Sequence, residues 1–80
     1  VHTPAIMAVS AMAQGLLPAT QTAMAFHNRL GYFDYRFGPD ACERMARAFA
    51  DVDTVILLNH GAMVAGRTIA EAYVQLHNLQ

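Results

Sequence analysis

Near the start of the chain, apolar side chains fall on nearly every face of a predicted helix. Thr3 is a favourable N-cap, Pro4 suits the first helical position, and Gly15 suits a helix stop. A helix that is apolar all round is buried on most of its sides, so this one requires protein packed around it. The apolar side chains between cap and stop are those of Ile6, Met7, Val9, Ala11 and Met12.

The next segment predicts either a long helix or a shorter helix followed by a strand. Thr20 is a candidate N-cap, and an apolar face at helical spacing leads to a stop at Gly31. The aromatic residues from Tyr32 to Tyr35 then have the propensity of a strand. The boundary lies at Gly31 or several residues earlier. The helical face consists of Ala23, Phe26, His27 and Leu30.

Two further helices are marked by capping boxes, in which a cap and an acid three residues later satisfy free backbone N–H groups. Asp40 and Glu43 have this spacing and predict a helix that runs to about Ala50. Thr68 and Glu71 form a full capping box before the last helix. The apolar stripe of that helix consists of Ile69, Ala72, Tyr73, Leu76 and Leu79.

Between these helices the pattern predicts a β-hairpin. Residues Thr54 to Leu58 form a continuous apolar, β-branched run, which is typical of a strand covered on both faces. Ala62 to Ala65 continue as a second apolar strand. The short connection Asn59-His60-Gly61 contains glycine and favours a tight turn.

Composition excludes several classes of function. The chain has 80 residues, 55% of them hydrophobic and 14% charged, so disorder is not expected. A net charge of -1 without a basic run argues against nucleic-acid binding and a polybasic membrane anchor. The longest apolar stretch, Pro4 to Ala13, is too short to span a bilayer. A single thiol, Cys42, and no signal peptide favour a cytoplasmic protein.

So small and apolar a chain needs support from a metal or from neighbouring structure, because its one cysteine cannot form an internal disulfide. It starts at Val1 rather than Met and ends at Gln80 within a predicted helix. We therefore expect residues 1–80 to be an excerpt of a longer protein, and we expect the excerpt alone not to fold stably.

Two of the four histidines are candidate metal ligands. His2 lies just before the cap of a buried helix, and His60 lies in the turn that follows a buried strand. Helix N-termini and strand ends are where α/β proteins usually place ligand sites. Gly61 leaves room for a ligand to approach the backbone closely. Two histidines are too few for a catalytic zinc site, which usually has three protein ligands, so another ligand must come from elsewhere.

The remaining chemistry favours ordinary structural roles. His77 is expected to be solvated and His27 to be a core or interface histidine, and Ser10 has a packing role within its helix. Other polar residues are able to reach a substrate or an anion, but a structural or exposed position is the simpler interpretation; these are Tyr32, Asp34, Tyr35 and Arg67. The sequence has no Gly-rich phosphate loop, Gly-x-Ser-x-Gly elbow or Cys-x-x-Cys pair.

Short blocks along nearly the whole chain resemble the class II aldolase and adducin family. They occur in the order and approximate spacing of that family, which makes the set far more specific than any one block. The blocks are His2-Thr3-Pro4-Ala5, Gly15-Leu16-Leu17-Pro18 with Gln21, Tyr32-x-Asp34-Tyr35, Leu58-Asn59-His60-Gly61, and the run from Ala65 to Ala72, Ala-Gly-Arg-Thr-Ile-Ala-Glu-Ala.

The resemblance implies a divalent-metal site. In the family, a His-x-His pair and a later Asn-His-Gly histidine bind the metal, commonly zinc, with manganese as an alternative. His2 corresponds to the second histidine of the pair and Val1 to the middle residue, which would place the first histidine just before Val1. His60 corresponds to the third ligand. The acid/base glutamate and the phosphate-binding loops lie upstream in the family, so no catalytic residue is assigned here.

The resemblance also implies the fold class, α/β with helices on both sides of a central sheet, of which residues 1–80 would be part of one three-layer α/β/α domain. Family enzymes, usually homotetramers, cleave or epimerise phosphorylated sugars, and the metal stabilises the enediolate left by retro-aldol cleavage. An aldolase or epimerase is therefore the first hypothesis. The alternative is a non-catalytic adducin-like binding or scaffold domain; a soluble α/β fragment with incidental histidines ranks last.

Overall fold

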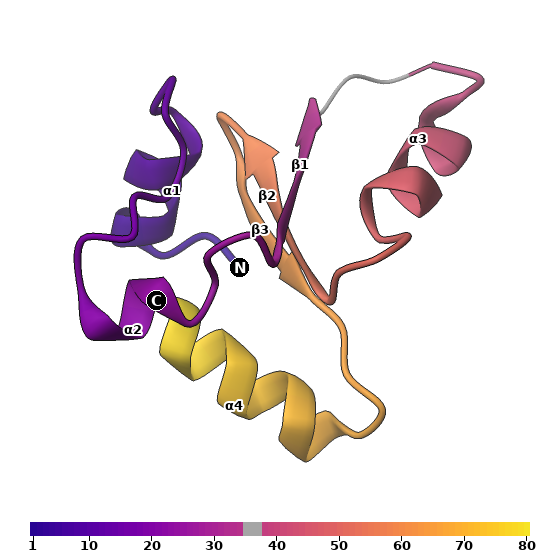
Figure 1. The fold of residues 1–80 in the computed structure, drawn as a ribbon. Helices are drawn as coiled ribbons and strands as arrows, with labels where there is room; N and C mark the ends of the chain where they lie inside the picture. The colour runs from indigo at the N-terminus through magenta and orange to yellow at the C-terminus, as the bar shows by residue number, and fades with distance from the viewer. Residues whose placement is uncertain (35–37) are drawn as a thin grey trace.

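The computed structural model describes residues 1–34 and 38–80, and Figure 1 shows the arrangement of their helices and strands. Tyr35 lies outside the described residues. The elements in chain order are α1 (Pro4–Ser10), α2 (Gln21–Met24), β1 (Leu30–Asp34), α3 (Ala41–Ala48), β2 (Thr54–Leu58), β3 (Gly61–Val64) and α4 (Ile69–Leu79).

The three strands form one mixed sheet in the order β1-β2-β3. β1 runs parallel to β2, with Tyr32 opposite Ile56. β2 and β3 form the predicted antiparallel hairpin, with Ile56 opposite Ala62. Residues 54–57 of β2 are all buried, which confirms the prediction of a strand covered on both faces.

The sheet separates two small apolar clusters, one on each face. On one face Ile56 and Ala62 pack with Ile6 of α1. On the other face Val55 and Leu57 pack with side chains of α3 and the loop after it. Figure 1 places α1 and α3 on opposite sides of the sheet. The described part of the chain therefore has helix, sheet and helix layers, and the α/β class is confirmed.

The helix from Thr20 is much shorter than its apolar spacing allows. Thr20 caps α2 as predicted, because its side-chain oxygen accepts a hydrogen bond from the Ala23 backbone N–H. The helix nevertheless ends at Met24. Asn28 has a positive φ of 59°, which a right-handed helix cannot contain, and the chain from Leu30 pairs with β2 instead. The earlier of the two predicted boundaries is correct.

The two capping boxes differ. Thr68 accepts a hydrogen bond from the Glu71 backbone N–H, as the pattern predicts. Asp40 occupies the N-cap position of α3 but makes no capping hydrogen bond, and its carboxylate lies 3.3 Å from the guanidinium of Arg44. Pairing with an arginine one turn later therefore takes the place of the predicted cap.

Helix burial is lower than the apolar patterns predict. In α1 only Ile6 and Ser10 are buried, and the Met7 side chain is half exposed. On α4 the predicted stripe is largely uncovered, since Ile69 is 91% and Tyr73 is 67% exposed. Within the described ranges, no helix has the length and apolar character needed to cross a membrane.

Candidate metal centre

His2 is held next to the hairpin by backbone pairing at the outer edge of β3. The Val1 nitrogen donates to the Ala62 carbonyl at 2.7 Å, and the Ala62 nitrogen donates to the Val1 carbonyl at 3.1 Å. Such a doubly bonded pair is the hydrogen-bonded pair of an antiparallel ladder. One residue further on from His2, Thr3 caps α1 with its side-chain oxygen. His2 is therefore fixed between a strand-like residue and a helix start.

His60 lies in the turn between β2 and β3. Its backbone N–H donates to the Leu57 carbonyl at 2.9 Å. The preceding residue, Asn59, has a positive φ of 59°, and its N–H donates to the carbonyl of Ser10, the last residue of α1, at 2.9 Å. The turn that carries His60 is thus bonded both to its own strand and to the helix that follows His2.

The structure brings the two histidine rings together across 58 positions of sequence. The Nε2 atoms lie 3.0 Å apart, and the rings are in edge-to-face contact with centroids 4.7 Å apart. A tetrahedral zinc ion with Zn–N bonds of about 2.0–2.1 Å holds two ligand nitrogens roughly 3.3 Å apart. The same separation also fits a hydrogen bond between the rings. The ring nitrogens are therefore within reach of one ion.

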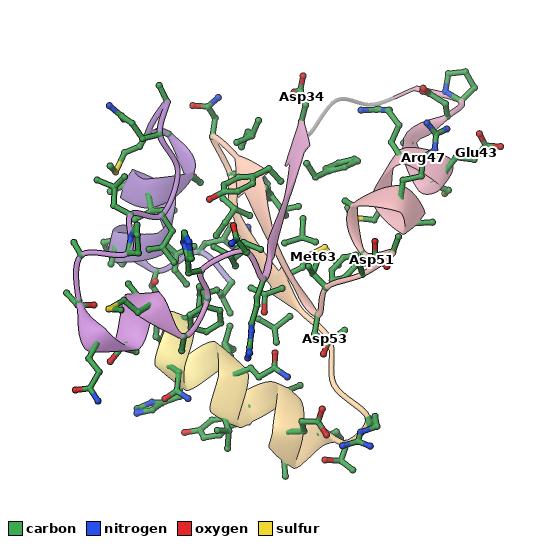
Figure 2. All side chains as sticks on the ribbon, viewed as in Figure 1. Asp34, Glu43, Arg47, Asp51, Asp53 and Met63 are labelled. Atoms are coloured by element: carbon green, nitrogen blue, oxygen red, sulfur yellow. The ribbon has the colours of Figure 1, made fainter. Side chains whose placement is uncertain are left out.

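A third ligand is not found among the described residues. Across residues 1–34 and 38–80, no three His, Cys, Asp or Glu side chains are grouped closely enough to hold a metal ion. Figure 2 shows the labelled carboxylates of Asp34, Glu43, Asp51 and Asp53 along β1, α3 and the start of β2, away from α1. Within the described ranges, the histidine pair would account for two of the three protein ligands that catalytic zinc usually has.

The comparison with known families agrees with these motifs and this fold. The sequence profile of the Class II Aldolase and Adducin N-terminal domain matches residues 1–80, the whole chain. The chain belongs to the class II aldolase and adducin family.

Relatives within the family include bacterial and animal proteins. The chain is 37% identical to a Pseudomonas aeruginosa protein provisionally named as a class 2 aldolase, over 99% of this chain and 32% of the relative. It is 36% identical to alpha-adducin of Rattus norvegicus, over 99% of this chain and 11% of that protein. The chain thus spans about a third of the bacterial relative and a smaller part of the adducin.

A solved structure of the same family has the same fold. The aldolase II superfamily protein from Pseudomonas syringae matches with a TM-score of 0.92 and 37% identity. The match covers 98% of this chain and 32% of that one. The arrangement of α1, the hairpin and α3 is therefore an arrangement found in this family.

The other polar residues that the sequence singled out lie in ordinary structural positions. His77 is exposed on α4, as predicted, with its ring stacked against Tyr73. His27 is exposed after the short α2, so a core position is wrong for it, and an interface role stays a prediction. Ser10 is 2% exposed and donates to the Met7 carbonyl, which confirms its packing role. Arg67 is exposed and pairs with Glu71.

Two residues of the family blocks meet in a structural contact. The Tyr32 hydroxyl accepts a hydrogen bond from the Leu16 backbone N–H at 3.1 Å. Gly15 has a positive φ of 68°, and a side chain there would overlap the Tyr32 ring. Tyr32 thus anchors the loop after α1, in agreement with its structural interpretation. On the same strand, the Asp34 carbonyl accepts a hydrogen bond from Arg44.

Sequence reasoning missed what actually approaches Gly61. The glycine was expected to leave room for a ligand, but the room is filled by this chain itself. A β-carbon at position 61 would overlap the Val1 carbonyl oxygen and lie 3.1 Å from Cδ2 of His2. No local pattern signals this contact, because it depends on the pairing of Val1 with β3.

Replacing Gly61 with alanine is therefore expected to displace Val1 and His2 from the hairpin. The Val1 carbonyl cannot retreat without weakening its bond to Ala62, so we expect a loss of about 1–3 kcal/mol in the free energy of unfolding. Denaturant titration of the intact protein measures it. Gly38→Ala is the matched control, because a β-carbon there meets only the carboxylate of Asp40 at 3.3 Å. Equal stability of the two variants would contradict the contact.

Proposed function

We propose that this chain is part of a metal-dependent aldolase or epimerase domain that acts on phosphorylated sugars, with His2 and His60 as ligands of its divalent metal. The observation that carries the proposal is the 3.0 Å approach of the two Nε2 atoms from distant parts of the sequence. Imidazole nitrogens are good ligands for zinc, the metal we propose first. Manganese, the alternative that the family resemblance implies, prefers oxygen ligands.

The third ligand in this proposal is a histidine directly before Val1. Val1 pairs with Ala62 as a strand residue does, and alternate residues of an extended segment point to the same side. A side chain before Val1 would therefore project on the same side as His2, toward the turn that carries His60. The acid/base glutamate of the proposed enzyme lies upstream as well.

The metal ion and the two histidines have different roles in the proposed reaction. A bound divalent ion supplies Lewis-acid stabilisation of negative charge on substrate oxygens. His2 and His60 hold it at the boundary of helix and hairpin, where His2 is exposed and His60 half-buried, so that a substrate can approach. The proposal includes a homotetramer, as the family resemblance implies, and a cytoplasmic location, which the single thiol favours.

The competing proposal is an adducin-like binding or scaffold domain. Its support is that alpha-adducin also matches over 99% of the chain, at 36% identity, nearly the 37% of the bacterial relative. The sequence of the intact protein separates the two cheaply. A histidine before Val1 and a suitably placed upstream glutamate favour the enzyme, and the loss of both favours the scaffold.

Metal content and turnover of the intact protein test the proposal. The protein is purified without chelators, and zinc and manganese are quantified by mass spectrometry. We expect about one ion per chain, and metal-dependent cleavage or epimerisation of at least one member of a panel of phosphorylated sugars. A chelator-treated sample is the control. A protein that neither retains nor takes up a divalent ion would rule out the enzyme and leave the scaffold.

A further inference from the structure

In the turn between β2 and β3, the residue before His60 has an unusual backbone conformation. Asn59 has a φ of 59°, in the left-handed region that most side chains avoid and that asparagine tolerates better than most. In the chain order, this residue separates the end of β2 from His60. Its backbone conformation therefore decides the direction in which the chain, and with it the His60 ring, leaves the strand.

The same residue connects the turn to the helix after His2. The Asn59 N–H donates to the carbonyl of Ser10 at 2.9 Å. Ser10 is itself fixed, since it is 2% exposed and its hydroxyl donates to the Met7 carbonyl at 2.7 Å. At the opposite end of α1, Val1 pairs with Ala62. The hairpin is thus bonded to both ends of the segment 1–10, at Val1 before α1 and at Ser10 where α1 ends.

From this geometry we infer that Asn59 is a positioning residue for the histidine pair, and that it acts through its left-handed backbone rather than through its side-chain amide. The backbone hydrogen bonds at Ala62 and at Ser10 fix where α1 and the hairpin meet. The conformation of Asn59 turns the His60 ring toward His2. The inference rests on the proposed metal site for its use in function, but the ring geometry that it explains is independent of any metal.

Substitutions at Asn59 distinguish the backbone role from a side-chain role. Asn59→Gly removes the amide but keeps the left-handed conformation readily accessible, whereas Asn59→Ala removes the amide and disfavours that conformation. If the backbone conformation is what matters, the glycine variant keeps zinc affinity close to the original. The alanine variant then loses about tenfold or more, the range seen when the support of a metal ligand is removed.

A second asparagine provides a matched control. Asn28 also has a φ of 59° but lies between α2 and β1, in a segment that carries neither His2 nor His60. Asn28→Ala is therefore expected to strain the backbone in the same way and to lower the thermal stability, while zinc affinity stays unchanged. A merely structural role of Asn59 would make the two alanine variants alike in both measurements.

The experiment uses the intact protein, with zinc affinity measured by competition against a chromophoric chelator and the Nε2–Nε2 distance of His2 and His60 measured in metal-free crystals. We expect the rings to stay in contact in Asn59→Gly and Asn28→Ala and to separate in Asn59→Ala. Loss of affinity or ring contact in Asn59→Gly overturns the inference. So does unchanged affinity and ring contact in Asn59→Ala.

Different results would contradict the proposed metal-dependent function and the proposed role of Asn59. If the original protein binds no metal, the proposed function fails, and the ring distances of the variants still decide the role of Asn59. If Asn59→Ala does not fold, Asn59→Gly alone decides between backbone and amide, because a role of the amide requires the glycine variant to lose ring contact.

Discussion

His60→Ala in the intact protein is expected to weaken zinc binding by more than about 100-fold, beyond the 10–100-fold that loss of an outer-shell partner costs. The reason is that His60 is proposed as a direct ligand whose Nε2 lies 3.0 Å from that of His2. Alanine leaves two of the three proposed imidazole ligands, that of His2 and that of the histidine proposed before Val1. Competition against a chromophoric chelator at neutral pH measures the change.

Further variants show whether the lost zinc affinity comes from one ion bound by both His2 and His60. His77→Ala is the matched control, because it removes an exposed imidazole on α4 that stacks on Tyr73 and has no place in the proposed site. It should bind zinc as the original does. His2→Ala should lose as much affinity as His60→Ala, and the double variant little more, since ligands of one ion act as a unit. Equal zinc binding by His60→Ala and His77→Ala would contradict the proposed ligands.

The candidate site was predictable in its residues but not in its construction. The ends of strands and the starts of helices are recognisable in sequence, and this singled out His2 and His60. Their contact depends on the pairing of Val1 with Ala62 and on the bond from Asn59 to Ser10, which join segments far apart in the chain. Long-range backbone pairing leaves no local pattern in the sequence, and so neither of these two backbone contacts was predicted. Metal binding by the pair stays a prediction.

The fold was predictable where one local signal dominated. The run Thr54–Leu58 is too short and too β-branched for a helix, and it forms the central strand. After Thr20 the apolar spacing favoured a longer helix, but a left-handed residue, Asn28, and parallel pairing with β2 ended it early. The position of Asp40 as a cap was correct, yet its hydrogen bond was not, because its backbone (φ -97°, ψ 6°) is not extended as that of a capping residue typically is.

Apolar periodicity predicted which faces of the helices are apolar but not how well they are covered. Ile6 contacts the sheet, whereas Ile69 and Tyr73 are exposed on α4. A hydrophobic stripe shows that a surface favours burial, but the partner that buries it need not lie in the same segment of chain. The expectation that residues 1–80 alone do not fold stably is in keeping with this exposure and stays a prediction.

Shortening Ile56, in the apolar cluster of Ile6, Ile56 and Ala62, is expected to cause a large loss of stability. Ile56 is 1% exposed and packs with Ile6 of α1 and Ala62 of β3, the two elements beside His2 and His60. Ile56→Ala is expected to lower the free energy of unfolding by about 2–5 kcal/mol, because it removes buried methyl groups and leaves a cavity. Denaturant titration of the intact protein measures the loss.

Ile56→Val is the matched control for this change, with an expected loss of about 0.5–1.5 kcal/mol. The alanine variant should also bind zinc more weakly than the valine variant, because α1 loses part of its contact with the sheet and His2 shifts with α1. Its affinity should nevertheless exceed that of His60→Ala, since both imidazoles are still present. If Ile56→Ala lost stability but bound zinc as tightly as Ile56→Val, the packing of α1 on the sheet would not be what holds His2 beside His60, and the backbone ties of Val1 and Asn59 would hold it instead.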